Sequence, residues 1–130
     1  MSEVAQTFLK RWHEIVAARD KTALPEVISE QACFRSPFFF APQHGRDYMA
    51  TVLSTVMDVL HDFEYHREFV DGQNLALEFS ATVGDLSVKG IDLIALDDEG
   101  LIAELEVFLR PMNGLQAAGK EMMRRLTGGD

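Results

Sequence analysis

The stretch that decides the fold is residues 88–110, VKGIDLIALDDEGLIAELEVFLR. It contains two apolar runs joined by the turn DDEG at residues 97–100, which is typical of two antiparallel strands. One acid, Asp92, stands inside the first run, between Ile91 and Leu93. Aspartate is depleted in strands and is rarely buried without a partner. Asp92 is therefore expected either to face solvent or to serve a function.

Composition and charge limit the classes of protein to which the chain can belong. Its 130 residues suffice for one domain, and 47% hydrophobic with 25% charged residues is typical of a globular rather than a disordered chain. The net charge of −9 would repel a phosphate backbone or an anionic membrane, and no basic stripe offsets it. We therefore expect neither nucleic acid nor a membrane as a partner.

Three features favour a cytoplasmic protein. The N-terminal residues MSEVAQTFLKRW lack the basic and then apolar layout of a signal peptide. The single cysteine, Cys33, cannot form a disulfide within the chain. No apolar run approaches the roughly 20 residues that a membrane-spanning helix needs.

The first half of the chain is expected to be mainly helical. Apolar residues recur at helical spacing over residues 4–16, behind a suitable N-cap at Ser2. Residues 22–28 favour a second, short helix, in which Pro25 is tolerated in the first turn. The third helix begins with GRD at residue 45 and has the clearest helical periodicity, up to Leu60.

Two shorter segments connect the second and third helices. Residues 32–36 indicate a brief strand. Residues 38–40, FFF, lie between Pro37 and Pro42, and the two prolines prevent a regular element. We expect an aromatic loop here, suited to act as a lid.

Four strands are expected in the second half of the chain. Strand-like runs separated by short turns occur at residues 61–70, 75–84, 86–96 and 101–110. Such short connections favour an antiparallel meander. In the second and fourth runs apolar residues alternate with polar ones, as a sheet with one buried face requires. The run 91–96 does not alternate, so we expect its second face to be covered in part, and a homodimer through the sheet would explain this.

The order of these elements, together with two phrases, resembles the nuclear transport factor 2-like superfamily. The phrases are HGR at residues 44–46, before the third helix, and IDLIALDDEG at residues 91–100. This group includes ketosteroid isomerase and the SnoaL-like polyketide cyclases. The resemblance covers residues 3–110 and implies one α+β domain, 1–130, with three N-terminal helices packed on a cone-shaped, curved antiparallel sheet. Residues 111–126 should add a C-terminal helix that caps the open end of the cone or packs on a partner.

The resemblance also implies a keto-enol isomerisation site. In that site a carboxylate is the base, while a tyrosine and a neutral aspartic acid donate hydrogen bonds to the developing oxyanion. On this chain the aspartic acid falls on Asp92, and the tyrosine falls on Trp12, whose indole N–H can donate but cannot exchange a proton. The base position falls on Ser36, just before Pro37, and a serine is no general base at neutral pH.

Further candidate site residues come from the loops and the expected core. His44, in the loop that enters the third helix, is a candidate acid or base because histidine titrates near neutrality. The histidines and acids lack the spacing of a metal site, so we expect no metal and no other cofactor. The residues expected to line the hollow and contact a ligand are Phe34, Ser36, Phe38, Phe39, Met57, Phe79 and Leu109.

Two classes of function remain open from the sequence. In the first, the protein holds a small apolar ligand, cyclic or carbonyl-bearing, oriented by Asp92, either as a binding protein or as an isomerase, cyclase or dehydratase. In the second, it is a non-catalytic module that associates through its sheet. Because the serine at the base position argues against the known chemistry but not against binding, we favour ligand binding. An Asp92 surrounded by apolar side chains should have a raised pKa and donate a hydrogen bond to a ligand oxygen.

Overall fold

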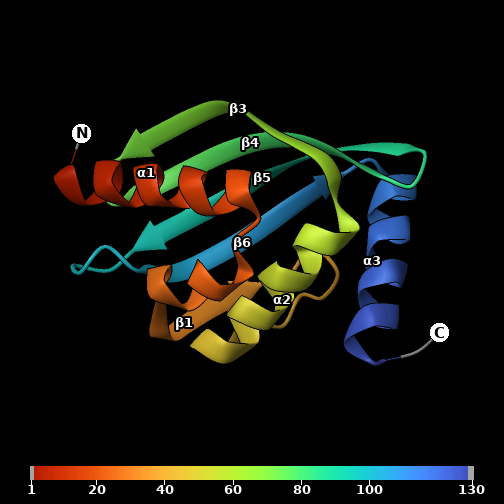
Figure 1. Ribbon diagram of the computed structural model, residues 1–130, viewed down its shortest axis with the longest axis horizontal. Helices are drawn as coiled ribbons and strands as arrows, with labels where there is room; N and C mark the ends of the chain where they lie inside the picture. Colours follow the sequence, from red (N-terminus) through yellow and green to blue (C-terminus); the bar gives the residue numbers. More distant parts are fainter. Residues whose placement is uncertain (1, 129–130) are drawn as a thin grey trace.

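A curved, open sheet of six strands forms one layer of the molecule, and the helices cover one of its faces (Figure 1). The structure is a computed structural model that describes residues 2–128. In chain order its elements are α1 (Glu3–Ala18), the 3-10 helix η1 (Lys21–Val27), β1 (Ile28–Arg35), β2 (Gln43–His44), α2 (Arg46–Val59), β3 (His61–Asp71), β4 (Asn74–Val83), β5 (Leu86–Leu96), β6 (Ile102–Arg110) and α3 (Met112–Leu126).

The strand order is β2-β1-β6-β5-β4-β3, so the α+β class and the predicted meander of the last four strands are confirmed. The sheet is mixed rather than wholly antiparallel, because β1 pairs in parallel with β6. The two-residue strand β2, which pairs antiparallel with β1, was not expected, because a segment this short has no recognisable period.

The helix boundaries follow from local chemistry. The Ser2 side chain accepts a hydrogen bond from the Ala5 N–H at 3.0 Å, as predicted for the N-cap of α1. The same helix ends at Arg19, which adopts a left-handed conformation with φ of 52°. The second helix is a 3-10 helix with Pro25 inside it, rather than an α-helix. This tighter turn suits a short connector between α1 and the sheet.

Strand β5 alternates strictly between the two faces of the sheet, and Asp92 points to the covered face. Asp92 is 8% exposed, whereas its neighbours Ile91 and Leu93 are 40% and 44% exposed on the outer face. The expectation that this outer face is covered is therefore not met within one chain. The pairing of β5 with β6 has a register shift between Ala95 and Leu96. This shift changes which residues at the start of β6 face the covered side, and Ile102 is buried there.

A close approach between β4 and β5 shapes the covered face. The ring of Phe79 lies directly over Gly90, where a Cβ atom would collide with that ring and with the Phe108 carbonyl oxygen. Only glycine leaves room for an aromatic ring against the backbone at this point. Phe79 thus packs closely against the backbone at Gly90 and is stacked on Phe63 of β3.

The C-terminal helix α3 packs against α2 and against strands β4, β5 and β6. Two glycines permit this approach, since Gly114 contacts Val88 and Gly119 contacts the Phe38 ring. Ala118 and Met122 of this helix are buried, while Leu126 is 42% exposed. The helix therefore lies where capping, one of its two expected roles, requires.

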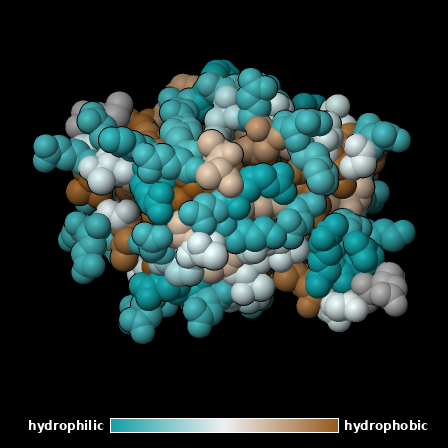
Figure 2. Space-filling view, viewed as in Figure 1, coloured by the Kyte–Doolittle hydropathy of each residue, from teal (hydrophilic) through white to brown (hydrophobic). Residues whose placement is uncertain are grey.

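The helix-bearing side of the molecule is mainly hydrophilic at its surface (Figure 2). The helices therefore direct their apolar faces to the sheet and their polar faces outward. No helix within residues 2–128 is both long enough and apolar enough to cross a membrane.

Candidate functional site

An apolar cavity lies between the covered face of the sheet and helices α1, α2 and α3. Its volume is about 130 Å³, many times what one water molecule requires. Aliphatic and aromatic side chains make most of its wall, and the polar groups among the lining residues are few. Such a hollow is typical of small-molecule binding sites.

Three polar side chains from separate elements form a hydrogen-bonded chain at one side of the cavity. The Trp12 indole N–H of α1 donates to the Tyr65 hydroxyl of β3 at 2.9 Å. The Tyr65 hydroxyl in turn donates to Asp92 Oδ2 of β5 at 2.7 Å. All three side chains line the cavity. Because the indole N–H of Trp12 can only donate, the Tyr65 oxygen accepts that bond and its own proton is directed to Asp92.

The carboxyl of Asp92 is electrostatically unusual. Burial raises its pKa from 3.8 to about 6, and the hydrogen bond from Tyr65 opposes this rise. Burial also raises the pKa of Tyr65 well above its usual value, and the nearby Asp92 carboxylate adds to that effect. Tyr65 therefore stays a neutral donor, while Asp92 exchanges its proton near neutral pH.

One oxygen of Asp92 is available to a ligand. Within residues 2–128, Oδ2 accepts a hydrogen bond from Tyr65 and Oδ1 accepts none. Every fully buried side-chain nitrogen or oxygen of these residues has a hydrogen-bond partner, so Oδ1 is not fully buried. The other oxygen, Oδ1, is therefore open to the cavity. A carboxyl in this state can accept a hydrogen bond or a proton when ionised and can donate one when protonated.

The structure brings together most of the side chains predicted for the site. The cavity is lined by Trp12, Phe34, Ser36, Phe38, Phe39, Met57, Phe79, Asp92 and Leu109. His44 is the exception, because it lies exposed in β2 and does not line the cavity. Its prediction relied on closeness in sequence to the third helix, which did not determine where its side chain points.

Ser36 occupies the wall of the cavity at the end of β1. Its hydroxyl accepts a hydrogen bond from the Phe38 N–H at 2.9 Å. This contact shapes the turn that carries the aromatic loop. The role that the structure supports for Ser36 is thus local positioning of Phe38 against α3.

Sequence reasoning missed Tyr65, Arg19 and the lining side of α3. Tyr65 pairs with Phe79 across β3 and β4, so the alternation of β4 could have placed it on the covered face. Irregularities in the register of β3 obscured that signal. Arg19 has no sequence signal, since it follows the fading apolar stripe of α1.

Comparison with known proteins connects this geometry to a family. The family model of the SnoaL-like domain matches residues 9–105. A steroid delta-isomerase from Pseudomonas aeruginosa is 45% identical, with a TM-score of 0.95 over 98% of this chain and 95% of that one. A protein with a cystatin-like fold from Silicibacter pomeroyi is 35% identical, with a TM-score of 0.88 over 92% and 85%.

More distant structures share the fold. A nuclear transport factor 2-like protein of unknown function from Mesorhizobium loti is 23% identical, with a TM-score of 0.75 over 85% of this chain and 93% of that one. No curated protein matches the sequence significantly.

The raised pKa of Asp92 predicts how stability depends on pH. A carboxyl whose pKa is higher in the folded state contributes full stability below its unfolded pKa and loses it as pH rises through the folded value. A shift from 3.8 to about 6 corresponds to about 3 kcal/mol. Asp92→Asn should therefore be more stable than the parent at pH 7.5, with the gain shrinking towards pH 4.

Urea unfolding of both proteins between pH 4 and 8 measures this difference. Asp85→Asn, at an exposed turn position, is the matched control and should follow the parent at every pH. A gain for Asp92→Asn that does not change with pH would show that Asp92 does not titrate as described.

Proposed function

This chain belongs to the SnoaL-like domain family, and we propose that it binds a small apolar molecule in its cavity. The observation that carries the proposal is one buried carboxyl, Asp92, with an oxygen open to an otherwise apolar hollow. An apolar ligand gains affinity by leaving water. A carbonyl or hydroxyl on that ligand would find its hydrogen-bond partner in Asp92, which fixes the orientation of the ligand.

The shape and chemistry of the wall favour a ring-bearing ligand. The Phe79 ring packs closely against Gly90, and Phe63 stacks on it with ring centroids 4.8 Å apart. Flat aromatic surfaces suit a rigid cyclic body better than a flexible polar one. We therefore propose a cyclic compound with an oxygen substituent that reaches Asp92.

Binding of 2-naphthol tests this proposal by calorimetry at pH 7. We expect the parent to bind it and Asp92→Asn to retain most of the affinity, because an amide can still pair with the phenol. Asp92→Leu should lose about 1 to 3 kcal/mol of binding free energy, because the ligand oxygen is left unpaired.

Asp85→Leu places the same substitution at an exposed turn and should leave 2-naphthol affinity unchanged. Circular dichroism of each variant would separate loss of binding from loss of folding. Equal affinity of the parent and Asp92→Leu, or no binding by the parent at millimolar concentration, would refute the proposed role of Asp92.

A second candidate function, proton transfer next to a carbonyl, is favoured by the pKa of Asp92. A pKa of about 6 lies close to the working pH that a general base or acid requires. Ser36 cannot serve as the base, so we propose that Asp92 takes the proton itself through Oδ1. The steroid delta-isomerase at 45% identity supports this class of reaction.

Exchange of the α-protons of 2-tetralone in D2O, followed by proton NMR, tests proton transfer. The rate above buffer background should rise through about pH 6, as Asp92 ionises, and then level off. Asp92→Asn should return the rate to background, whereas Asp85→Asn should not. If Asp92→Asn exchanged the ketone as fast as the parent, the protein would have no such activity at Asp92.

We also propose that two copies associate through the outer face of the sheet. Four large apolar side chains are exposed there, at 40 to 59%: Phe69, Ile91, Leu93 and Phe108. Ile91 and Phe108 are direct partners across β5 and β6, so they form one patch. Glu78 lies beside them, held by Arg67 and Lys89. A charge neutralised in this way can be covered at low cost by a second copy.

Light scattering at micromolar concentration should return about twice the chain mass of 14.6 kDa. Leu93→Lys should give a monomer, because it places a charge in the apolar patch. Phe40→Lys adds the same charge to a fully exposed loop position and should remain dimeric. A parent protein with the mass of one chain would exclude this association.

A further inference from the structure

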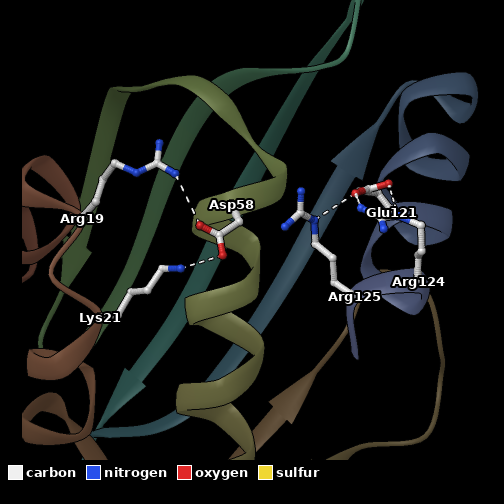
Figure 3. Close-up of polar contacts among 6 residues, drawn as sticks. All are labelled: Arg19, Lys21, Asp58, Glu121, Arg124 and Arg125. Carbon is white, nitrogen blue, oxygen red and sulfur yellow. Dashed lines mark hydrogen bonds and ion pairs between the residues drawn. The ribbon is translucent and has the colours of Figure 1, made fainter. Parts of the chain in front are cut away.

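The cavity reaches the surface beside a cluster of charged residues from α1, η1, α2 and α3 (Figure 3). Arg19, at the end of α1, is the one cation among the described residues that line the cavity. Met57, Met123 and Leu126 line the cavity near it, from the ends of α2 and α3. The opening therefore combines apolar side chains with a guanidinium group.

The guanidinium of Arg19 forms only a long ion pair with an acid of the protein. Its guanidinium donates to the Met57 carbonyl oxygen and lies 3.9 Å from Asp58 Oδ1. The closer partner of that acid is Lys21, whose Nζ lies 2.6 Å from Oδ2. Because Asp58 is already paired, Arg19 has donors left for a ligand, and five N–H groups are available on a guanidinium.

A second arginine approaches the same place from α3. Arg125 donates to Glu121 at 2.9 Å, and its side chain lies between Glu121 and Asp58 in Figure 3. The hydrogen bond from Lys21 is the main cause of the lowered pKa of Asp58, and both Arg125 and Arg19 contribute to it. The two arginines thus lie on either side of Asp58.

The six side chains of this cluster together carry a charge opposite in sign to that of the whole chain. Of the six residues drawn in Figure 3, Arg19, Lys21, Arg124 and Arg125 are cations, whereas Asp58 and Glu121 are the acids. The chain as a whole carries −9. Because salt screens charges beyond about 8 Å at physiological ionic strength, a ligand at the opening experiences chiefly this local excess of cations.

We propose that the ligand of this cavity is an amphipathic acid, with its apolar body in the cavity and its carboxylate at the opening, bound by Arg19 and assisted by Arg125. This inference rests on the proposed binding function and adds the chemical class of the ligand. The orientation follows from charge. An anion placed at the inner end would meet the Asp92 carboxyl, which repels it when ionised, so only the Arg19 end accepts a carboxylate.

A matched pair of probes tests the inference: 4-phenylbutyrate and its neutral amide, 4-phenylbutyramide. Trp12 is the only tryptophan of the chain and lines the cavity, so its fluorescence reports binding of either probe. The parent should bind the acid about five- to tenfold more tightly than the amide, as a charge-assisted hydrogen bond at a half-exposed site provides. High salt should reduce this preference.

Arg19→Gln should weaken binding of the acid more than binding of the amide, so that the preference for the acid is lost, and Arg19→Lys should retain part of that preference. Arg125→Gln should reduce it less than Arg19→Gln does. Arg11→Gln is the control, since Arg11 is an exposed cation of the same helix that pairs with Glu14 and Glu26 and does not line the cavity.

The outcomes separate this inference from the function on which it rests. Equal binding of acid and amide by the parent, or an unchanged preference in Arg19→Gln, would overturn the proposed ligand class while leaving small-molecule binding in place. Failure of both probes and of 2-naphthol to bind would refute the binding function itself.

Discussion

The hydrogen bond from the Tyr65 hydroxyl to Asp92, 2.7 Å long, is the constraint on which the rest of the site depends. A buried carboxyl without a partner would be too costly to retain in an apolar interior. Tyr65 satisfies one oxygen, and Trp12 orients Tyr65 by donating to it. The three side chains come from α1, β3 and β5, so this polar chain can form only when helix and sheet are docked together.

The apolar surroundings of this polar chain determine what the cavity can do. Burial brings the pKa of Asp92 to about 6, which permits both proton states near neutrality. Phe79, which packs closely against Gly90, supplies an aromatic part of the cavity wall. At the other end, Arg19 carries the opposite charge at the opening. If the cavity binds ligands as proposed, an acid inside it and a cation at its opening would discriminate them by the position of their charge as well as by their shape.

The helix α3 approaches its neighbours through small residues, and it lines the cavity with both small and large ones. Gly114 and Gly119 let its backbone approach Val88 and Phe38, and Ala118 and Met122 are then buried. The aromatic loop expected from residues 38–40 thus contacts α3 at Phe38, while Phe40 remains in solvent. This part of the cavity wall is consequently formed by two segments that are far apart in the sequence.

Local periodicity in the sequence by itself determined the α+β class, the positions of the long elements, and the inward direction of Phe79. Those features repeat every two or 3.6 residues, so each is readable within one segment. Only the tertiary structure decided the partner of Asp92, because Tyr65 is 27 positions away and its strand has an irregular register. It also placed His44 outside the cavity and Arg19 at its opening. These depend on how separate elements dock, and docking is set by packing across the whole core rather than by any local pattern.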